Sequence, residues 1–274
     1  MDLGVLNRAE LLATDLTDAD LRRKVRSGEL TRLRSGWYAG RDADDDAVIA
    51  ARRFGAISCV TGLRKHGLWI PPGYDSLHVR AGKAAQGRRR DYCHLPGRPL
   101  PVGTILDEIP LCLCCAAGCM TAEDWNAVTD SALNSLDLDI ADLHEQMPRT
   151  DARIDHLLSR CDSRSQSGTE SIVRVRLRAL GFRVEVQPKI PDVGHVDLKV
   201  GRLLLECDSK LHHTSLENYR KDRRRDRKSL GHKYMTMRLT YDDALYGWDE
   251  TLADIREVTL PQRHRIRRGT SAND

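Results

Sequence analysis

Apolar and polar residues alternate along three short segments in the C-terminal half of the chain. The segments are Phe182–Gln187, His195–Val200 and Leu203–Asp208. Strict alternation is the pattern of a half-buried β-strand, so we predict three strands. Only Gly201-Arg202 separates the last two segments, and glycine at the first position of a two-residue loop favours a type II′ hairpin turn.

This turn sets the register of the predicted hairpin. Val200 then faces Leu203, Asp197 faces Glu206, and His195 faces Asp208. Directly opposed side chains have Cβ atoms about 4.5–5.5 Å apart, and opposed like charges destabilise a sheet. A shared proton or a divalent cation relieves such a pair, and carboxylate oxygens suit Mg²⁺, Mn²⁺ or Ca²⁺. The alternative is a longer loop, a slipped register and solvated acids.

Capping residues predict helices elsewhere. Ser167–Glu170 is a capping box before an apolar face, and Gly181 ends that helix. Asn7–Glu10 and Thr17–Asp20 begin two more helices, the second of which runs to about Ser27 before Gly28.

A predicted hairpin with a turn at Ser35-Gly36 follows these two N-terminal helices. This order gives the outline of a winged helix-turn-helix, which binds DNA through a helix and a basic wing. Four exposed arginines are the candidate nucleic-acid contacts: Arg22, Arg23, Arg32 and Arg34. An ordinary helical domain with exposed arginines is the alternative.

The middle of the chain is predicted to be α/β. A strand is expected at Leu77–Ala81 and an exposed basic loop at Gly82–Arg90. Helices are expected at Ile109–Ala117, Thr121–Leu133, Ile140–Gln146 and Asp151–Cys161. The polar segment Asp162–Gly168 marks a domain boundary. The predicted parts are 1–72, 73–161, 162–260 and a basic tail at 261–274.

Composition agrees with a globular chain of more than one domain. Of 274 residues, 40% are hydrophobic and 31% charged. We find no apolar run of roughly 18 residues and no basic-then-apolar signal pattern at the N-terminus, so we expect a cytoplasmic protein without a membrane partner.

Positive charge is concentrated in two runs, although the formal net charge is only +4. They are Tyr219–Lys228 and Arg263–Arg268. Dense local charge favours phosphate contact, whereas a solvated helix face and a tail are the alternative. The first run supplies the candidate nucleic-acid contacts Arg220, Lys221, Arg223, Arg224 and Arg227.

Four of the eight cysteines form a cluster in the sequence. They are Cys112, Cys114, Cys115 and Cys119, which lie among leucine, alanine and methionine with no C-x-x-C pair and no nearby histidine. This spacing does not fit a structural zinc site, so we predict buried apolar packing. Disulfides are not expected.

The N-terminal segments LRRKVRSGELTRLRSGWYAG and ISCVTGLRKHGLWIPP resemble the N-terminal domain of abortive-infection type IV antitoxins. The resemblance covers about 80 residues. It implies a winged helix that binds DNA, often an operator.

The C-terminal part resembles the PD-(D/E)xK nuclease superfamily, which carries a helical glutamate and then a hairpin with Asp and Glu. The corresponding residues are Glu170, Asp197 and Glu206. ECDSKLHH, NYRKDRRRDRKSLGHKY and MTMRLTYDD are similar to the branch related to very-short-patch repair endonucleases. The resemblance implies a restriction-endonuclease-like mixed sheet flanked by helices, hence an α/β (α+β) fold class.

The resemblance also implies a metal site. Asp197 and Glu206 would hold Mg²⁺ or Mn²⁺, with Glu170 in the outer shell or at a second ion. The superfamily lysine belongs two residues after Glu206, where this chain has Asp208 instead. The general base is therefore open among Lys210, Gln187, His212, His213 and a metal-bound hydroxide.

The expected function is a metal-dependent DNA endonuclease with an N-terminal DNA-binding or regulatory domain, acting in restriction, repair or phage defence. The alternatives are a non-cleaving repressor or antitoxin-like regulator, and RNA cleavage. Expected partners are DNA, with a homodimer and a toxin or defence-system partner as further candidates.

Overall fold

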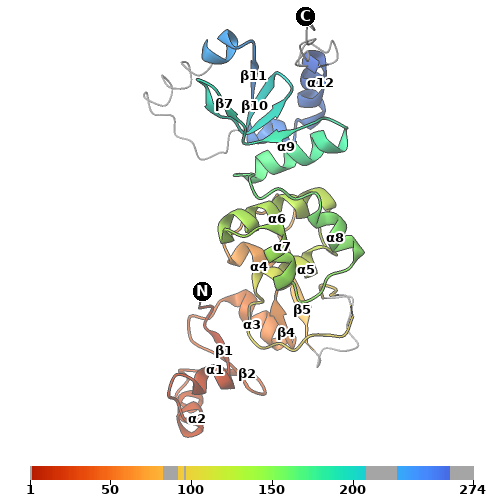
Figure 1. The fold of residues 1–274 in the computed structure, drawn as a ribbon. Coiled ribbons are helices and arrows are strands. Elements are labelled where there is room, and N and C mark those ends of the chain that lie inside the picture. Colours follow the sequence, from red (N-terminus) through yellow and green to blue (C-terminus); the bar gives the residue numbers. More distant parts are fainter. Residues whose placement is uncertain (1, 83–91, 96, 208–226, 260–274) are drawn as a thin grey trace, which may run out of the picture. The chain divides into compact units, whose positions relative to one another are not determined.

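The chain forms two compact units with mixed α/β structure and small sheets (Figure 1). The computed structural model describes residues 2–82, 92–95, 97–207 and 227–259. The first unit comprises Met1–Trp125 and Ala141–Ser159, and the second comprises Asn126–Ile140 and Arg160–Asp274.

The first unit begins with a small antiparallel sheet and two helices. The sheet order is β1-β3-β2. The elements are β1 (Val5–Asn7), α1 (Arg8–Leu12), α2 (Asp18–Arg26), β2 (Thr31–Arg34) and β3 (Trp37–Ala39). Both predicted capping boxes are present, and Gly28 adopts a φ of +73° just after α2. Strand β1 was not predicted, because three residues are too few to show an alternation of apolar and polar positions.

The remainder of the first unit packs helices against a two-stranded sheet. Its elements are α3 (Asp45–Arg52), β4 (Gly55–Ile57), α4 (Cys59–Lys65), β5 (Val79–Ala81), α5 (Ile109–Ala116) and α8 (Ala152–Leu158). Helices α4 and α5 pack together, and β4 pairs with β5 (Figure 1). A buried bidentate ion pair between Arg80 and Asp107 lies in this unit, with distances of 2.6 and 2.7 Å.

Helix α5 confirms part of the prediction made for the cysteine cluster. Cys112, Cys114 and Cys115 are buried within it, as small apolar residues would be. Cys119 lies after the helix and is half-buried. The basic loop predicted at Gly82–Arg90 falls outside the described residues beyond Gly82.

The second unit holds a four-stranded sheet with helices. The sheet order is β11-β10-β9-β6, where β10 and β11 are parallel and the other pairs are antiparallel. Strands β7 and β8 form a separate pair. The elements are α9 (Gly168–Ala179), β6 (Glu185–Val186), β7 (Lys189–Ile190), β8 (Gly194–His195), β9 (Leu198–Val200), β10 (Leu203–Cys207), β11 (Met235–Leu239), α11 (Tyr241–Leu245) and α12 (Trp248–Thr259).

Two helices, α6 (Ala122–Leu136) and α7 (Ile140–Gln146), contribute residues to both units. The chain passes from the first unit to the second for the last time at Ser159–Arg160, next to the domain boundary predicted between 161 and 162. The boundary predicted between 72 and 73 falls inside the first unit. Among the described residues, no helix combines the length and apolar character needed to cross a bilayer.

The predicted hairpin register is confirmed next to the turn, and the pairing of Asp197 with Glu206 stays a prediction. Val200 pairs with Leu203, and the next two pairs are Lys199 with Leu204 and Leu198 with Leu205. Gly201 has a φ of +60°, whereas Arg202 is not among the residues with positive φ. Positive φ at the first loop residue alone distinguishes a type II′ turn from a type I′ turn.

The single strand predicted at His195–Val200 is wrong. The chain bends at Asp197 and forms two strands, so that His195 pairs with Lys189 of β7. Asp208, the partner predicted for His195, lies outside the described residues. At the bend the Asp197 carbonyl accepts the N–H of Gln187 at 2.9 Å. Alternation cannot reveal the bend, because the residues on both sides of it continue the same apolar pattern.

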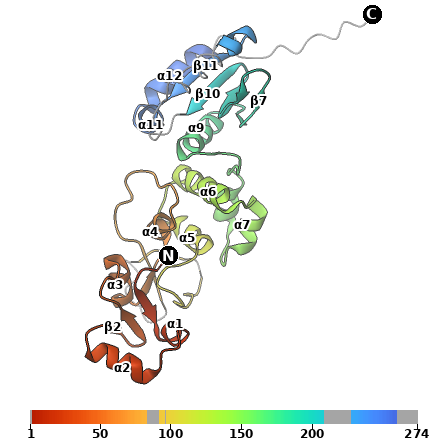
Figure 2. The same cartoon turned by 90° about the vertical axis from the view of Figure 1, so that its left-hand side faces the viewer.

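Strand β10 is buried on both faces. Leu203, Leu205 and Cys207 pack in the main core with side chains of α9 and α12, as the alternation predicted. Figure 2 shows these two helices beside the sheet that contains β10. Leu204 packs on the other face with a small cluster that includes Val196. A rigid strand, enclosed by apolar contacts, therefore leads to the half-buried Glu206.

Candidate functional site

Glu170 lies in the first turn of α9, where the local sequence starts the helix. The N-cap Ser167 accepts the N–H of Glu170 through its Oγ at 3.1 Å. A full capping box is not formed, since the Glu170 carboxylate accepts the N–H of Gln166 at 2.9 Å instead of that of Ser167. Only 1% of Glu170 is exposed.

Gln187 connects Glu170 to Asp197. Its Nε2 lies 3.2 Å from Oε1 and Oε2 of Glu170 and 3.2 Å from Oδ1 of Asp197. Gln187 also adopts a φ of +47°, a conformation that costs of order 1–3 kcal/mol in a residue other than glycine. Two carboxylates from different elements are thus joined by one amide.

Asp197 in turn contacts the end of β10. Its Oδ2 accepts the N–H of Cys207 at 2.7 Å. The carboxylate thus satisfies a main-chain donor that the carbonyl of a neighbouring strand would otherwise satisfy. Glu206 directly precedes Cys207 and is aligned with Arg238 in the parallel pairing of β10 with β11. The structure therefore brings Glu170, Gln187 and Asp197 together at the strand end that carries Glu206.

Burial makes this site electrostatically unusual. The pKa of the Glu170 carboxyl is raised to about 8, mainly by burial and in smaller part by the nearby Asp197 carboxylate. The hydrogen bonds from Gln166 and Gln187 act in the opposite direction but are outweighed. A divalent cation at such a site would favour the ionised form of the carboxyl, which burial disfavours.

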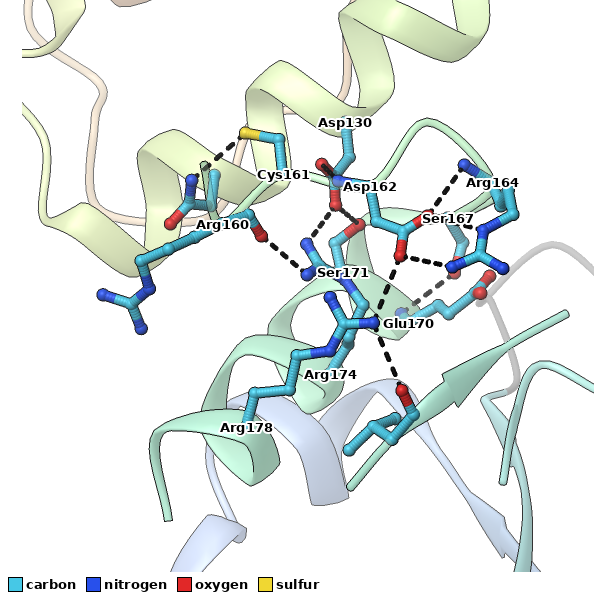
Figure 3. Close-up of polar contacts among 12 residues, drawn as sticks. Asp130, Arg160, Cys161, Asp162, Arg164, Ser167, Glu170, Ser171, Arg174 and Arg178 are labelled. Atoms are coloured by element: carbon cyan, nitrogen blue, oxygen red, sulfur yellow. Dashed lines mark hydrogen bonds and ion pairs between the residues drawn. The ribbon is translucent and has the colours of Figure 1, made fainter. Parts of the chain in front are cut away.

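A buried network anchors the first turns of α9 (Figure 3). Asp130 of α6 accepts hydrogen bonds from Ser171 Oγ at 2.7 Å, Arg174 Nη2 at 2.6 Å and the N–H of Asp162 at 2.8 Å. Ser171 follows Glu170 directly, so the network fixes the turn that presents the glutamate. Asp130 was not predicted from the sequence, because no local pattern links a helical aspartate to a helix so much later in the chain.

The same network fixes the segment that leads into α9 (Figure 3). Arg174 Nη1 donates to the carbonyl of Arg160 at 2.7 Å. Arg178 Nη2 lies 3.2 Å from both Asp162 Oδ2 and the Val184 carbonyl. Helix α9 is therefore tied to the residues before it and to the approach to β6.

Several predicted site residues lie outside the described part of the chain. They are Asp208, Lys210, His212, His213, Arg220, Lys221, Arg223 and Arg224. Arg227 is described, and it is helical and exposed. The roles predicted for all of these residues stay predictions.

The N-terminal arginines differ in their surroundings. Arg22 and Arg23 are exposed on α2, Arg32 is exposed on β2, and Arg23 is paired with Asp20 at 2.5 Å. The Arg34 guanidinium instead stacks on Trp37 and Phe54, 4.7 and 5.2 Å from the ring centres, and burial lowers its pKa. This stacking makes Arg34 a weaker candidate for phosphate contact than Arg32.

Comparison of the chain with protein-family models, with curated proteins and with solved structures finds no match. The chemistry that the site can support is therefore inferred from its own residues and their geometry. Carboxylates and an amide converge at a rigid strand end, which is a set of hard oxygen donors of the kind that Mg²⁺ and Mn²⁺ take.

Proposed function

We propose that the second unit hydrolyses phosphodiester bonds of DNA with Mg²⁺ or Mn²⁺, on a restriction-endonuclease-like fold. The observation that supports this most is the bonded chain Glu170–Gln187–Asp197–Cys207, which joins a buried and a half-buried acid to the strand end that bears Glu206. Its order along the chain agrees with the helical glutamate and hairpin acids of the PD-(D/E)xK pattern.

The donor set fits such a metal. Each ionised carboxylate has about four lone-pair positions, so Asp197 can bind a cation while its oxygens accept from Gln187 and Cys207. Asp197 and Glu206 would be the ligands, with Glu170 in the outer shell. The ion would polarise a phosphate oxygen and lower the pKa of a bound water.

Gln187 fits a positioning role better than that of a general base. A carboxamide has no basic nitrogen at neutral pH, and here its Nε2 donates to both acids. Lys210, His212, His213 and a metal-bound hydroxide remain the candidates for the base.

We propose that the first unit contains a winged helix that binds or regulates access to DNA. The order of β1, two short helices and the β2–β3 hairpin supports this, as do the exposed arginines on α2 and β2. Phosphate contacts of this kind contribute affinity without sequence preference.

Replacing Arg22 and Arg32 together with alanine is expected to weaken binding of the full chain to all duplexes by similar factors. It should reduce the slope of log affinity against log salt by about 2, since each phosphate contact contributes about 0.9. Fluorescence anisotropy across a salt series measures this. Arg8→Ala is the control, because Asp18 already holds the Arg8 guanidinium with bonds of 2.8 and 2.5 Å. An unchanged slope in the double variant would count against this surface.

The nuclease proposal is tested with supercoiled plasmid. Purified full-length protein is incubated with Mg²⁺, with Mn²⁺ and with EDTA, beside an Asp197→Ala variant. We expect nicking that needs the metal and is absent in the variant. Equal behaviour of both proteins on DNA, with every metal, contradicts the proposal, and cleavage of RNA alone would redirect it to RNA.

The second candidate is a repressor or antitoxin-like regulator that binds DNA without cutting it. The sequence feature that favours it is Asp208 in the place of the superfamily lysine. Specific DNA binding by wild-type protein with no cleavage under any metal would support this candidate.

A further inference from the structure

Four side chains that are far apart in the sequence converge in the first unit. They are Cys59, His78, Cys93 and Cys119, and their donor atoms all lie within 4.8 Å of one another. The Nδ1 of His78 is 3.3 Å from the Sγ of Cys93. We propose that these four residues form a structural zinc site. It is separate from the acidic site of the second unit, which consists of Glu170, Gln187, Asp197 and Glu206.

The arrangement matches the size of a tetrahedral zinc centre. Zinc binds sulfur at about 2.3 Å and imidazole nitrogen at about 2.0–2.1 Å, which places the donor atoms roughly 3.5–3.8 Å apart. Donors within 4.8 Å therefore need only a small contraction to close around the ion. Three sulfurs and one nitrogen are the soft ligands that select zinc over Mg²⁺ or Ca²⁺.

Main-chain hydrogen bonds hold these ligands in place. The N–H of His78 donates to Thr61 Oγ1 of α4 at 2.9 Å, and its carbonyl accepts the N–H of Ser58 at 3.2 Å, next to Cys59. The N–H of Cys93 donates to the Val79 carbonyl at 2.8 Å, so Cys93 lies beside β5. The convergence is thus built by the fold and does not depend on flexible side chains.

The histidine also has the partner that a zinc ligand needs. Ser76 Oγ lies 3.3 Å from His78 Nε2, the ring nitrogen that points away from Cys93. Ligating histidines usually donate their second ring N–H to such an acceptor, which fixes the ring orientation. With Nδ1 on the metal, Nε2–H would donate to Ser76.

The backbone at one ligand departs from ordinary geometry. Cys59 is fully buried and adopts a φ of +54°, a backbone outlier of the kind that accumulates at functional sites.

The site is closed, and this indicates a structural role. Four protein ligands fill the tetrahedral positions of zinc, so none is left for water or substrate. The ion would join the start of α4, the approach to β5, the segment at Cys93 and the segment that follows α5. The ion would thus cross-link segments whose cysteines are free thiols.

The test is the metal content of the full-length protein, purified with a reductant and without chelator. We expect about one zinc per chain by inductively coupled plasma mass spectrometry. In competition with a chelator, the zinc affinity of Cys119→Ser should be at least about 10- to 100-fold lower than that of wild type. Loss of an outer-shell partner already lowers metal affinity by this factor, and loss of a ligand should cost no less. Asp197→Ala should retain it, which separates this site from the acidic one.

Cys114→Ser is the matched control. Cys114 is buried in α5, and its Sγ donates to the Arg149 carbonyl at 3.0 Å, a bond that a serine hydroxyl can keep. Its zinc content should equal that of wild-type protein. Equal zinc in Cys119→Ser and wild type would overturn the proposal, as would iron in place of zinc.

A second measurement does not depend on the variant. Apo wild-type protein reconstituted with Co²⁺ should show the d–d absorption of tetrahedral cobalt and thiolate-to-cobalt charge transfer. The proposal would be overturned if the wild-type chain took up neither Zn²⁺ nor Co²⁺. It would also be overturned if two of the three ligand cysteines formed a disulfide in protein purified under reducing conditions.

Discussion

An Asp197→Asn variant is expected to lose plasmid cleavage by at least about 10³-fold while remaining folded. The substitution keeps the size of the side chain but removes the charge that holds the cation. Loss of one preorganised electrostatic stabiliser costs about 10²–10³ in rate, and loss of the metal itself costs more. Initial rates of nicking at saturating Mg²⁺ measure the effect.

The cost of this substitution to the fold is predictable. Asp197 accepts from Gln187 Nε2 through Oδ1 and from the Cys207 N–H through Oδ2. An asparagine has a single acceptor oxygen, so one of these bonds is lost, at about 1–3 kcal/mol for the donor left unpaired. Circular dichroism should therefore show a folded protein with a lowered unfolding temperature.

Asp192→Asn is the matched control for Asp197→Asn. Asp192 is an exposed acid of the same unit that pairs with His232 at 3.1 Å, and asparagine tolerates its φ of +60°. Its cleavage rate should equal that of wild type. An Asp197→Asn variant that is as active as Asp192→Asn would remove Asp197 from the metal site and with it the main support for the nuclease proposal.

Replacing Arg174 with methionine is expected to destabilise the second unit by about 3–5 kcal/mol. Arg174 and Asp130 form an ion pair in which each side chain is only 1% exposed, with a distance of 2.6 Å. Removal of one partner leaves the other charge buried without compensation. Burial already raises the pKa of Asp130 even with Arg174 beside it, which shows how costly its ionised form is.

The measurement must be local, because a chain of two units need not unfold in a single transition. Hydrogen–deuterium exchange of the α9 amides reports the opening free energy of this helix. Arg178→Met is the control, since the Arg178 side chain is 35% exposed and its bond to Asp162 is 3.2 Å long. Its effect should stay below about 1 kcal/mol.

A double variant tests whether the two charges act as a pair. Asp130→Leu combined with Arg174→Met removes both charges, and the pair of substitutions should cost less than the sum of the two single ones. Additive effects would mean that the ion pair does not couple α6 to α9. Cleavage by Arg174→Met should also fall, because Arg174 and Ser171 fix the turn that presents Glu170.

Local sequence features predicted much of the second unit correctly. Gly201-Arg202 set the hairpin register, and the alternation of Leu203, Leu205 and Cys207 gave the core face of β10. A two-residue turn that begins with glycine, and the alternation of apolar and polar residues along a strand, depend only on neighbouring residues. Both can therefore be recognised in the sequence before the fold is known. The bend at Asp197 depends on Gln187 and Cys207, which the alternation does not involve.

The sequence by itself determined helix starts, the hairpin turn, the strand faces and the candidate acids, because capping, turn geometry and amphipathic period act over a few residues. Only the tertiary structure decided which distant side chains meet. It placed Asp130 beside Arg174, Gln187 between Glu170 and Asp197, and Cys119 with Cys59, His78 and Cys93. Such contacts arise from packing between elements, and no spacing along the chain encodes them.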